Sequence, residues 1–108
     1  AVNFLKRQRY KILTRNYRTR LGEIDIIAMD RDTLVFVEVK ARHSERYGHP
    51  KAAVTPAKQR KISMVALQYL KETGRMKDRA RFDVVSIRSR EKGPDIEILK
   101  NAFELAYT

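Results

Sequence analysis

The sequence predicts an α/β domain with a mixed β-sheet flanked by helices, and three observations support this fold class. Five segments show the period of two, or the runs of β-branched residues, that are typical of strands. Two segments have apolar residues at helical spacing, in the order helix, three strands, helix, two strands. The second helical segment is long enough for a crossover, so we expect the strands before and after it to pair in parallel.

Length and composition agree with one domain. The chain has 108 residues, of which 43% are hydrophobic, and this allows an ordinary core. We therefore expect residues 1–108 to form a single domain. Because the chain begins at Ala1 and not at Met, we leave open that residues upstream belong to the same domain.

The N-terminal part is expected to form a helix and a strand that carry many cations. Val2 to Arg9 has Val2 and Leu5 at helical spacing, and Tyr10 to Tyr17 has the pattern of a strand. Residues 1–22 contain seven Lys or Arg residues and no Asp or Glu. Each of these cations taken singly is typical of a solvated surface, but as a set we expect them to bind phosphate.

The stretch from Gly22 to Arg42 predicts a β-hairpin with its turn at residues 30–32. Alternation places Glu23 and Asp25 together on the first strand. It also places Glu38 and Lys40 together near the end of the second. Antiparallel pairing around the turn brings position 25 opposite 37 or 38, so we expect the acids to converge.

The second half is expected to supply a loop, a long helix and two strands. Residues 41–55 read as a loop over the acids, with His43 and His49 as the only histidines. Thr55 and Pro56 are typical of a helix start, and a helix is expected from there to residues 73–74. Strands are expected over 82–87 and 96–99, with Asp83 paired to a neighbouring arginine.

Carboxylates that converge inside a half-buried sheet need a neutralising partner. Hard divalent cations such as Mg²⁺ or Mn²⁺ take oxygen ligands of this kind. A nearby lysine, here Lys40, can orient an attacking water or stabilise charge on a phosphorane. A purely structural alternative stays open, in which Glu38 pairs with Lys40 and Glu23 pairs with Arg18 or Arg20.

The overall charge points to a polyanionic partner. The formal net charge is +11 and the sequence pI is about 10.3, which favours nucleic acid over an anionic membrane surface. The absence of cysteine excludes disulfides and thiol chemistry. No apolar run reaches the ~18 residues of a membrane span, so we expect no membrane partner and a cytoplasmic location.

The combined pattern RNYR, GEIDIIA, LVFVEVKAR, YGHP and AAV resembles a known family. It is similar to the YraN-type family of uncharacterised bacterial proteins, within the PD-(D/E)xK nuclease superfamily and similar to archaeal Holliday-junction resolvases. The likeness runs from about Leu5 to Phe103. It implies a restriction-endonuclease-like fold with an αβββαβ core.

The resemblance also implies a metal-dependent site. Asp25, Glu38 and the carbonyl of Val39 would hold Mg²⁺ or Mn²⁺, Lys40 would position the attacking water, and Glu23 would reach a second ion or an outer water. The expected nucleic-acid contacts are Arg15, Arg18, Arg20, Arg42, Lys58 and Gln59.

Two departures from the resolvase pattern matter. Those enzymes add a glutamate from the first helix, whereas no acid precedes Glu23 here. That residue lies upstream of Ala1, or Glu23 replaces it, or the site is incomplete. Ile24 also stands before Asp25 where the superfamily pattern has proline.

We therefore predict a metal-dependent DNA endonuclease that acts on branched DNA as a homodimer, with DNA favoured over RNA. The alternative is a non-catalytic nucleic-acid-binding protein that retains the nuclease fold. A third interpretation, a basic interaction module of the ribosome or replication machinery, requires neither metal nor strong DNA binding.

Overall fold

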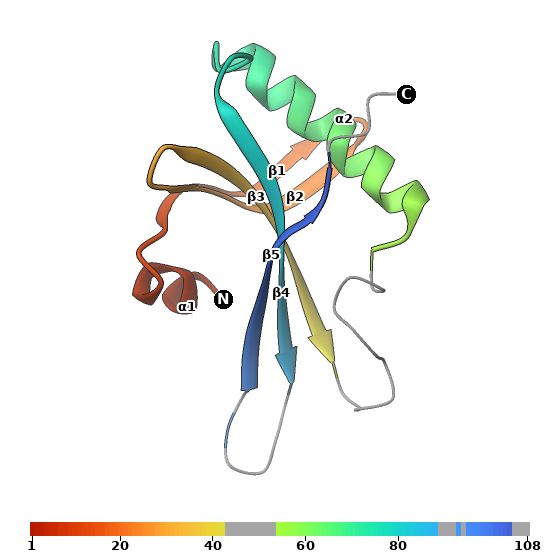
Figure 1. The fold of residues 1–108 in the computed structure, drawn as a ribbon. Helices are drawn as coiled ribbons and strands as arrows, with labels where there is room; N and C mark the ends of the chain where they lie inside the picture. The colour runs from red at the N-terminus through yellow and green to blue at the C-terminus, as the bar shows by residue number, and fades with distance from the viewer. Residues whose placement is uncertain (43–53, 89–92, 94, 105–108) are drawn as a thin grey trace.

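A computed structural model of the chain describes residues 1–42, 54–88, 93 and 95–104. Two helices and five strands follow one another in the predicted order (Figure 1). The elements are α1 (Val2–Arg7), β1 (Lys11–Thr19), β2 (Gly22–Asp30), β3 (Thr33–Arg42), α2 (Pro56–Glu72), β4 (Arg79–Arg88) and β5 (Asp95–Phe103).

The five strands form one mixed sheet in the order β1-β2-β3-β4-β5. β3 and β4 are parallel, and the other neighbouring strands are antiparallel. The expected crossover is confirmed, because α2 connects the two parallel strands. This arrangement is a mixed α/β fold, and it is consistent with the restriction-endonuclease-like core that the resemblance implies.

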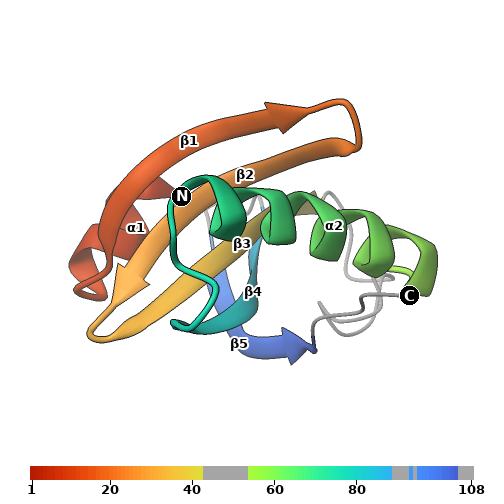
Figure 2. The ribbon, with the colours of Figure 1, turned by 90° about the horizontal axis from the view of Figure 1, so that it is seen from above.

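The two helices lie on opposite faces of the sheet (Figures 1 and 2). On the α2 face, Ile62, Val65 and Tyr69 pack with Ile24 and Phe36 in the larger core cluster. On the α1 face, a smaller cluster is built from the helix and the opposite side of the same strands, with Leu5, Tyr10, Ile26, Val35, Val37 and Val85 buried. The sheet is therefore apolar on both sides, and burial of both faces stabilises it.

The expected helix from Thr55 is confirmed in detail. The Thr55 hydroxyl accepts a hydrogen bond from the Lys58 N–H at 3.2 Å, and Pro56 occupies the first turn. The helix ends at Glu72, just before the residues predicted to stop it. The capped start fixes the first turn of α2, which carries Lys58 and Gln59.

Several element boundaries differ from the prediction. α1 ends at Arg7 and not Arg9, because Arg9 adopts a left-handed φ of 68°. β4 begins at Arg79 and β5 extends to Phe103, so both strands are longer than expected. Their extra residues are largely polar, and pairing with a neighbouring strand keeps such residues extended where sequence patterning is weak.

The prediction that Asp83 pairs with an arginine is confirmed, but Asp83 also accepts hydrogen bonds from other donors. Its carboxylate is fully buried and accepts hydrogen bonds from Tyr10, Arg81 and the Asn101 N–H at 2.8–3.0 Å. Arg81 also binds Asp30 at 2.6 Å. This network joins Tyr10, which precedes β1, to β2, β4 and β5, and it lies outside the predicted cluster of site acids.

Candidate functional site

Asp25 and Glu38 meet where β2 begins and β3 approaches its end. The register of the hairpin pairs Ile26 with Val37, so the next position places Asp25 opposite Glu38, as predicted. The Val39 N–H donates a hydrogen bond to Asp25 Oδ2 at 2.8 Å. Backbone pairing and this bond hold the Asp25 carboxylate beside the strand that carries Glu38.

The environment of Asp25 disfavours its charged form. Burial raises the pKa of Asp25, the Val39 N–H opposes this shift, and the charges of Glu38 and Glu23 raise the pKa further. Lys58 is the cation that partly offsets these effects. A carboxylate held in this way is suited to a site that supplies additional positive charge.

Two lysines converge on Glu38 from different elements. Lys58 Nζ lies 2.9 Å from Glu38 Oε1, and Lys40 Nζ lies 3.5 Å from the same oxygen. The adjacent Lys58 ammonium, together with partial burial, lowers the pKa of Lys40. Burial works against the charged form of Lys58 too, but the carboxylates of Glu38 and Asp25 raise its pKa overall. The structural alternative included an ion pair between Glu38 and Lys40, and this ion pair exists. Lys58 is nevertheless closer to Glu38 than Lys40 is.

A hollow of about 190 Å³ lies between the hairpin and α2. Asp25, Glu38 and Lys58 contribute to its wall, and Ile62 and Val65 of α2 form an apolar side. Glu23 also lines the hollow, but its side chain is 55% exposed and pairs with Arg18 at 3.1 Å. Glu23 therefore stands at the rim, in the ion pair that the structural alternative foresaw.

The strand geometry is irregular at Asp25. Ile24 packs on the α2 face, whereas Ile26 packs in the cluster on the α1 face, so the alternation of faces breaks between them. On β1, Asn16 lies between the residues paired with Ile26 and Ile24, and it adopts a left-handed φ of 53°. Irregularities of this kind redirect side chains and are common beside functional sites. The sequence analysis missed Asn16, although asparagine inside a strand pattern is itself unusual.

The residues predicted to contact nucleic acid are distributed over several surfaces. Arg18 and Arg20 are exposed near the turn between β1 and β2, and Arg18 is engaged with Glu23. Gln59 Nε2 donates to the Val54 carbonyl at 2.9 Å, which ties it to the chain before α2. Arg15 lies in a hollow on the α1 face. The Arg42 side chain, His43 and His49 lie outside the described residues.

The site chemistry fits a small divalent ion. In the part of the chain that the structure describes, no group of three or more Asp, Glu, His or Cys side chains could hold a metal. Mg²⁺ nevertheless binds through one or two protein carboxylates when substrate phosphates complete its shell. Asp25 and Glu38 provide such a pair, and the charge repulsion between them is the kind that a cation relieves.

Comparisons with known proteins place the chain in a family. The model of the uncharacterised protein family UPF0102 matches residues 1–87. A UPF0102 protein of Desulfosudis oleivorans is 55% identical over 96% of this chain and 83% of the relative. A UPF0102 protein of Geobacter metallireducens is 56% identical over 99% of this chain and 88% of the relative. None of the described helices is long and apolar enough to cross a membrane. The predicted family is confirmed, and the chain belongs to UPF0102, the YraN-type family.

Proposed function

We propose that this protein is a metal-dependent DNA endonuclease of the PD-(D/E)xK type. The observation that carries the proposal is the meeting of Asp25, Glu38 and Lys58 in one hollow, with Lys40 Nζ 3.5 Å from Glu38 and the Asp25 pKa raised by burial and by neighbouring carboxylates. The net charge of +11 suits a phosphate-rich substrate. Branched DNA and a homodimer remain part of this proposal.

Each residue has a distinct role in the proposed reaction. Asp25 and Glu38, with the Val39 carbonyl, would hold Mg²⁺ or Mn²⁺, which supplies an activated water and offsets phosphate charge. Lys40 orients the attacking water or neutralises the developing charge on phosphorus. Lys58, which reaches Glu38 from α2, adds a second positive charge at the same place. Glu23, at the rim of the hollow, would bind a water molecule in the outer shell of the metal ion.

A non-catalytic nucleic-acid-binding protein is the second candidate. The observation that favours it is the neutralisation of Glu38 by two lysines within the chain itself. A carboxylate already paired in this way satisfies the fold without a metal ion. The two candidates differ in whether divalent ions bind at Asp25 and Glu38.

The test is cleavage of labelled duplex, single-stranded, flapped and four-way-junction DNA in Mg²⁺ or Mn²⁺. We expect the parent to cut at least one substrate only when the ion is present. Glu38→Gln keeps the size of the side chain and removes its charge. It should reduce cleavage about 100-fold or more, because even outer-shell partners of a metal typically change activity 10- to 100-fold.

Glu97→Gln is the matched control, since Glu97 is an exposed glutamate on β5. It should cut like the parent. A parent that binds these DNAs and never cuts them, with no heat of Mg²⁺ or Mn²⁺ binding by calorimetry, would exclude the nuclease and leave the non-catalytic alternative.

A further inference from the structure

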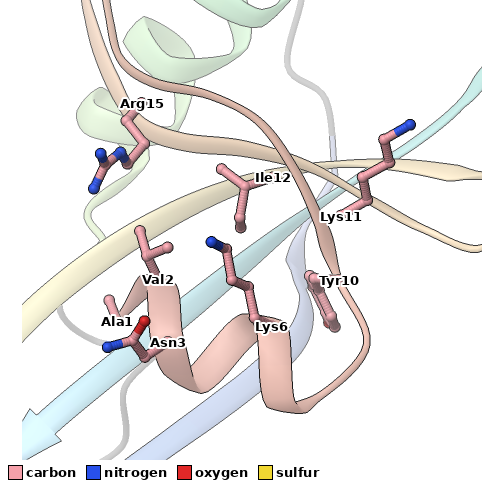
Figure 3. Close-up of a pocket in the computed structure, with 8 residues that line it drawn as sticks. All are labelled: Ala1, Val2, Asn3, Lys6, Tyr10, Lys11, Ile12 and Arg15. Carbon is pink, nitrogen blue, oxygen red and sulfur yellow. The ribbon is translucent and has the colours of Figure 1, made fainter.

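A basic hollow lies on the α1 face, between α1 and the start of β1, and the proposed reaction does not use it. It has a volume of about 810 Å³ and is lined by Lys6, Lys11 and Arg15 together with Tyr10 and Ile12. None of the described residues that line it carries a carboxylate. Figure 3 shows the Lys6 ammonium close to Ile12, Arg15 at one end of the hollow, and Lys11 pointing away from α1. We name this feature the α1 hollow.

Among the described residues, the cations of the α1 hollow face no acid, whereas several other cations of the molecule are neutralised. Arg18, Arg75, Arg79, Arg81 and Lys100 each pair with an Asp or Glu. Within the described part of the chain, Lys6, Lys11 and Arg15 have no such partner. A concave surface lined by charges of one sign concentrates the field and attracts a polyanion.

The α1 hollow is separate from the candidate site. The acids and lysines of the site lie on the α2 face, against Ile62 and Val65. The α1 hollow lies across the sheet, at β1, which is an edge strand (Figure 1). A ligand in this hollow therefore does not touch Asp25 or Glu38 directly.

We propose that the α1 hollow binds the phosphate backbone of nucleic acid, away from the phosphodiester that reacts. Lys6 and Arg15 make the direct phosphate contacts. Lys11 pairs with Met29, which packs on the α2 side of the sheet, so Lys11 takes no part in these contacts. Lys6 and Arg15 would each neutralise one phosphate.

This inference rests on the proposed function for its choice of nucleic acid, and it adds a substrate feature. A nucleic acid that occupies both the α1 hollow and the site must reach around the β1 edge. Affinity then depends on the hollow, whereas the bond-breaking step depends on the site. Variants of the hollow should accordingly change KM and leave kcat and metal binding intact.

The experiment compares the Lys6→Gln/Arg15→Gln double variant with the parent, as full chains. The probe is labelled duplex DNA longer than 44 Å, the greatest extent of the molecule, and binding is measured in EDTA so that no cleavage occurs. Each phosphate contact contributes about 0.9 to the slope of log K against log salt concentration. The double variant should lose about 1.8 from this slope, with affinity on the order of tenfold weaker at low salt.

The control is Arg60→Gln/Lys71→Gln, which removes two exposed cations on α2 and changes the net charge equally. It should keep the parent's slope. Thermal melting checks that both double variants fold. An unchanged slope in the hollow variant, or an equal loss in both variants, would overturn the α1 hollow as a DNA site.

The outcome for the hollow is independent of the outcome for catalysis. Suppose that the parent binds DNA without cutting it while the Lys6→Gln/Arg15→Gln variant loses part of the salt slope. That result overturns the proposed nuclease and supports the α1 hollow as a DNA site. A parent that does not bind DNA overturns the hollow whatever the cleavage assay gives. If the Lys6→Gln/Arg15→Gln variant loses binding to anionic vesicles but binds DNA like the parent, the α1 hollow binds a membrane surface. That result likewise overturns the α1 hollow as a DNA site.

Discussion

At the scale of single residues, Asp25 shows most directly how function and stability oppose each other. Its carboxylate is partly buried, lies opposite Glu38, and accepts a hydrogen bond from the Val39 N–H. Burial and the charges of Glu38 and Glu23 raise its pKa above the ordinary value of 3.8. The folded protein therefore favours protonated Asp25, and ionised Asp25 at neutral pH lowers the free energy of unfolding.

Asp25→Asn should consequently be more stable than the parent at pH 7. Asparagine can still accept the Val39 hydrogen bond but does not ionise. Because the folded pKa is raised, the parent loses stability as pH rises above about 3.8, and the variant does not. Urea unfolding from pH 3 to pH 8 should show the two proteins converging at the acid end and separating above it.

The control variant is Asp32→Asn, and Mn²⁺ binding gives a second readout. Asp32→Asn removes an exposed carboxylate whose ion pair with Arg79 is also exposed, and such pairs contribute ~0–1 kcal/mol. Added Mn²⁺ should raise the melting temperature of the parent and not that of Asp25→Asn. A variant less stable than the parent at pH 7 would show that Asp25 is a structural carboxylate.

At the scale of elements, two asparagines mark irregular strands. Asn16 in β1 and Asn101 in β5 both adopt a φ of 53°. The Asn101 N–H leaves the regular ladder to bind Asp83, and Asn16 lies across from Asp25, where the strand alternation breaks. Asparagine tolerates left-handed backbone better than other residues with a side chain, so it permits irregular geometry at these positions.

Asn16→Val should destabilise the protein by about 1–2 kcal/mol, because a β-branched residue is strained at positive φ. Asn16→Gly should stay within about 0.5 kcal/mol of the parent, since glycine accepts this conformation. Urea denaturation measures both. Equal stability of the valine and glycine variants would mean that the left-handed conformation does not constrain β1.

At the scale of the whole molecule, a buried polar network connects the N-terminal part of the sheet with strands β4 and β5. Tyr10 precedes β1, Asp83 lies in β4, and the Tyr10 hydroxyl donates to Asp83 Oδ2 at 2.8 Å. Arg81 Nη2 also binds the Tyr10 hydroxyl at 2.8 Å, while its Nε binds Asp83. Because Asp83 is fully buried, each of its donors is needed to offset the loss of hydration.

Tyr10→Phe should reduce the free energy of unfolding by about 1.5–3 kcal/mol, the range for a hydrogen bond to a charged buried group. Tyr17→Phe is the matched control, because its hydroxyl binds Glu72 at 2.7 Å on the surface, and it should cost less than about 1 kcal/mol. Thermal and urea unfolding test the pair. Similar losses in both variants would show that burial of Asp83 adds nothing to the bond.

The sequence predicted the elements and their order because periodicity and capping are local properties. The start of α2 at Thr55 and Pro56, the hairpin turn near residue 31, and the approach of Asp25 to the end of β3 all depend on neighbouring residues. The crossover of α2 and the parallel pairing of β3 with β4 followed from that order. The family assignment depended on the combined sequence pattern and is confirmed.

Other features depend on contacts between residues far apart in the chain, and only the tertiary structure decided them. Lys58 meets Glu38 because the start of α2 packs over the end of β3, and the extent of the Asp83 network depends on residues from β2, β4 and β5 and on Tyr10 before β1. Sequence spacing placed Asp25 near Glu38, but it left open whether Glu23 joins the acids or pairs with Arg18 or Arg20, and the structure places Glu23 at the exposed rim with Arg18. Local patterning thus determined the elements and the candidate acids. Long-range packing decided which charges lie together, because electrostatic partners are set by distance in space and by burial.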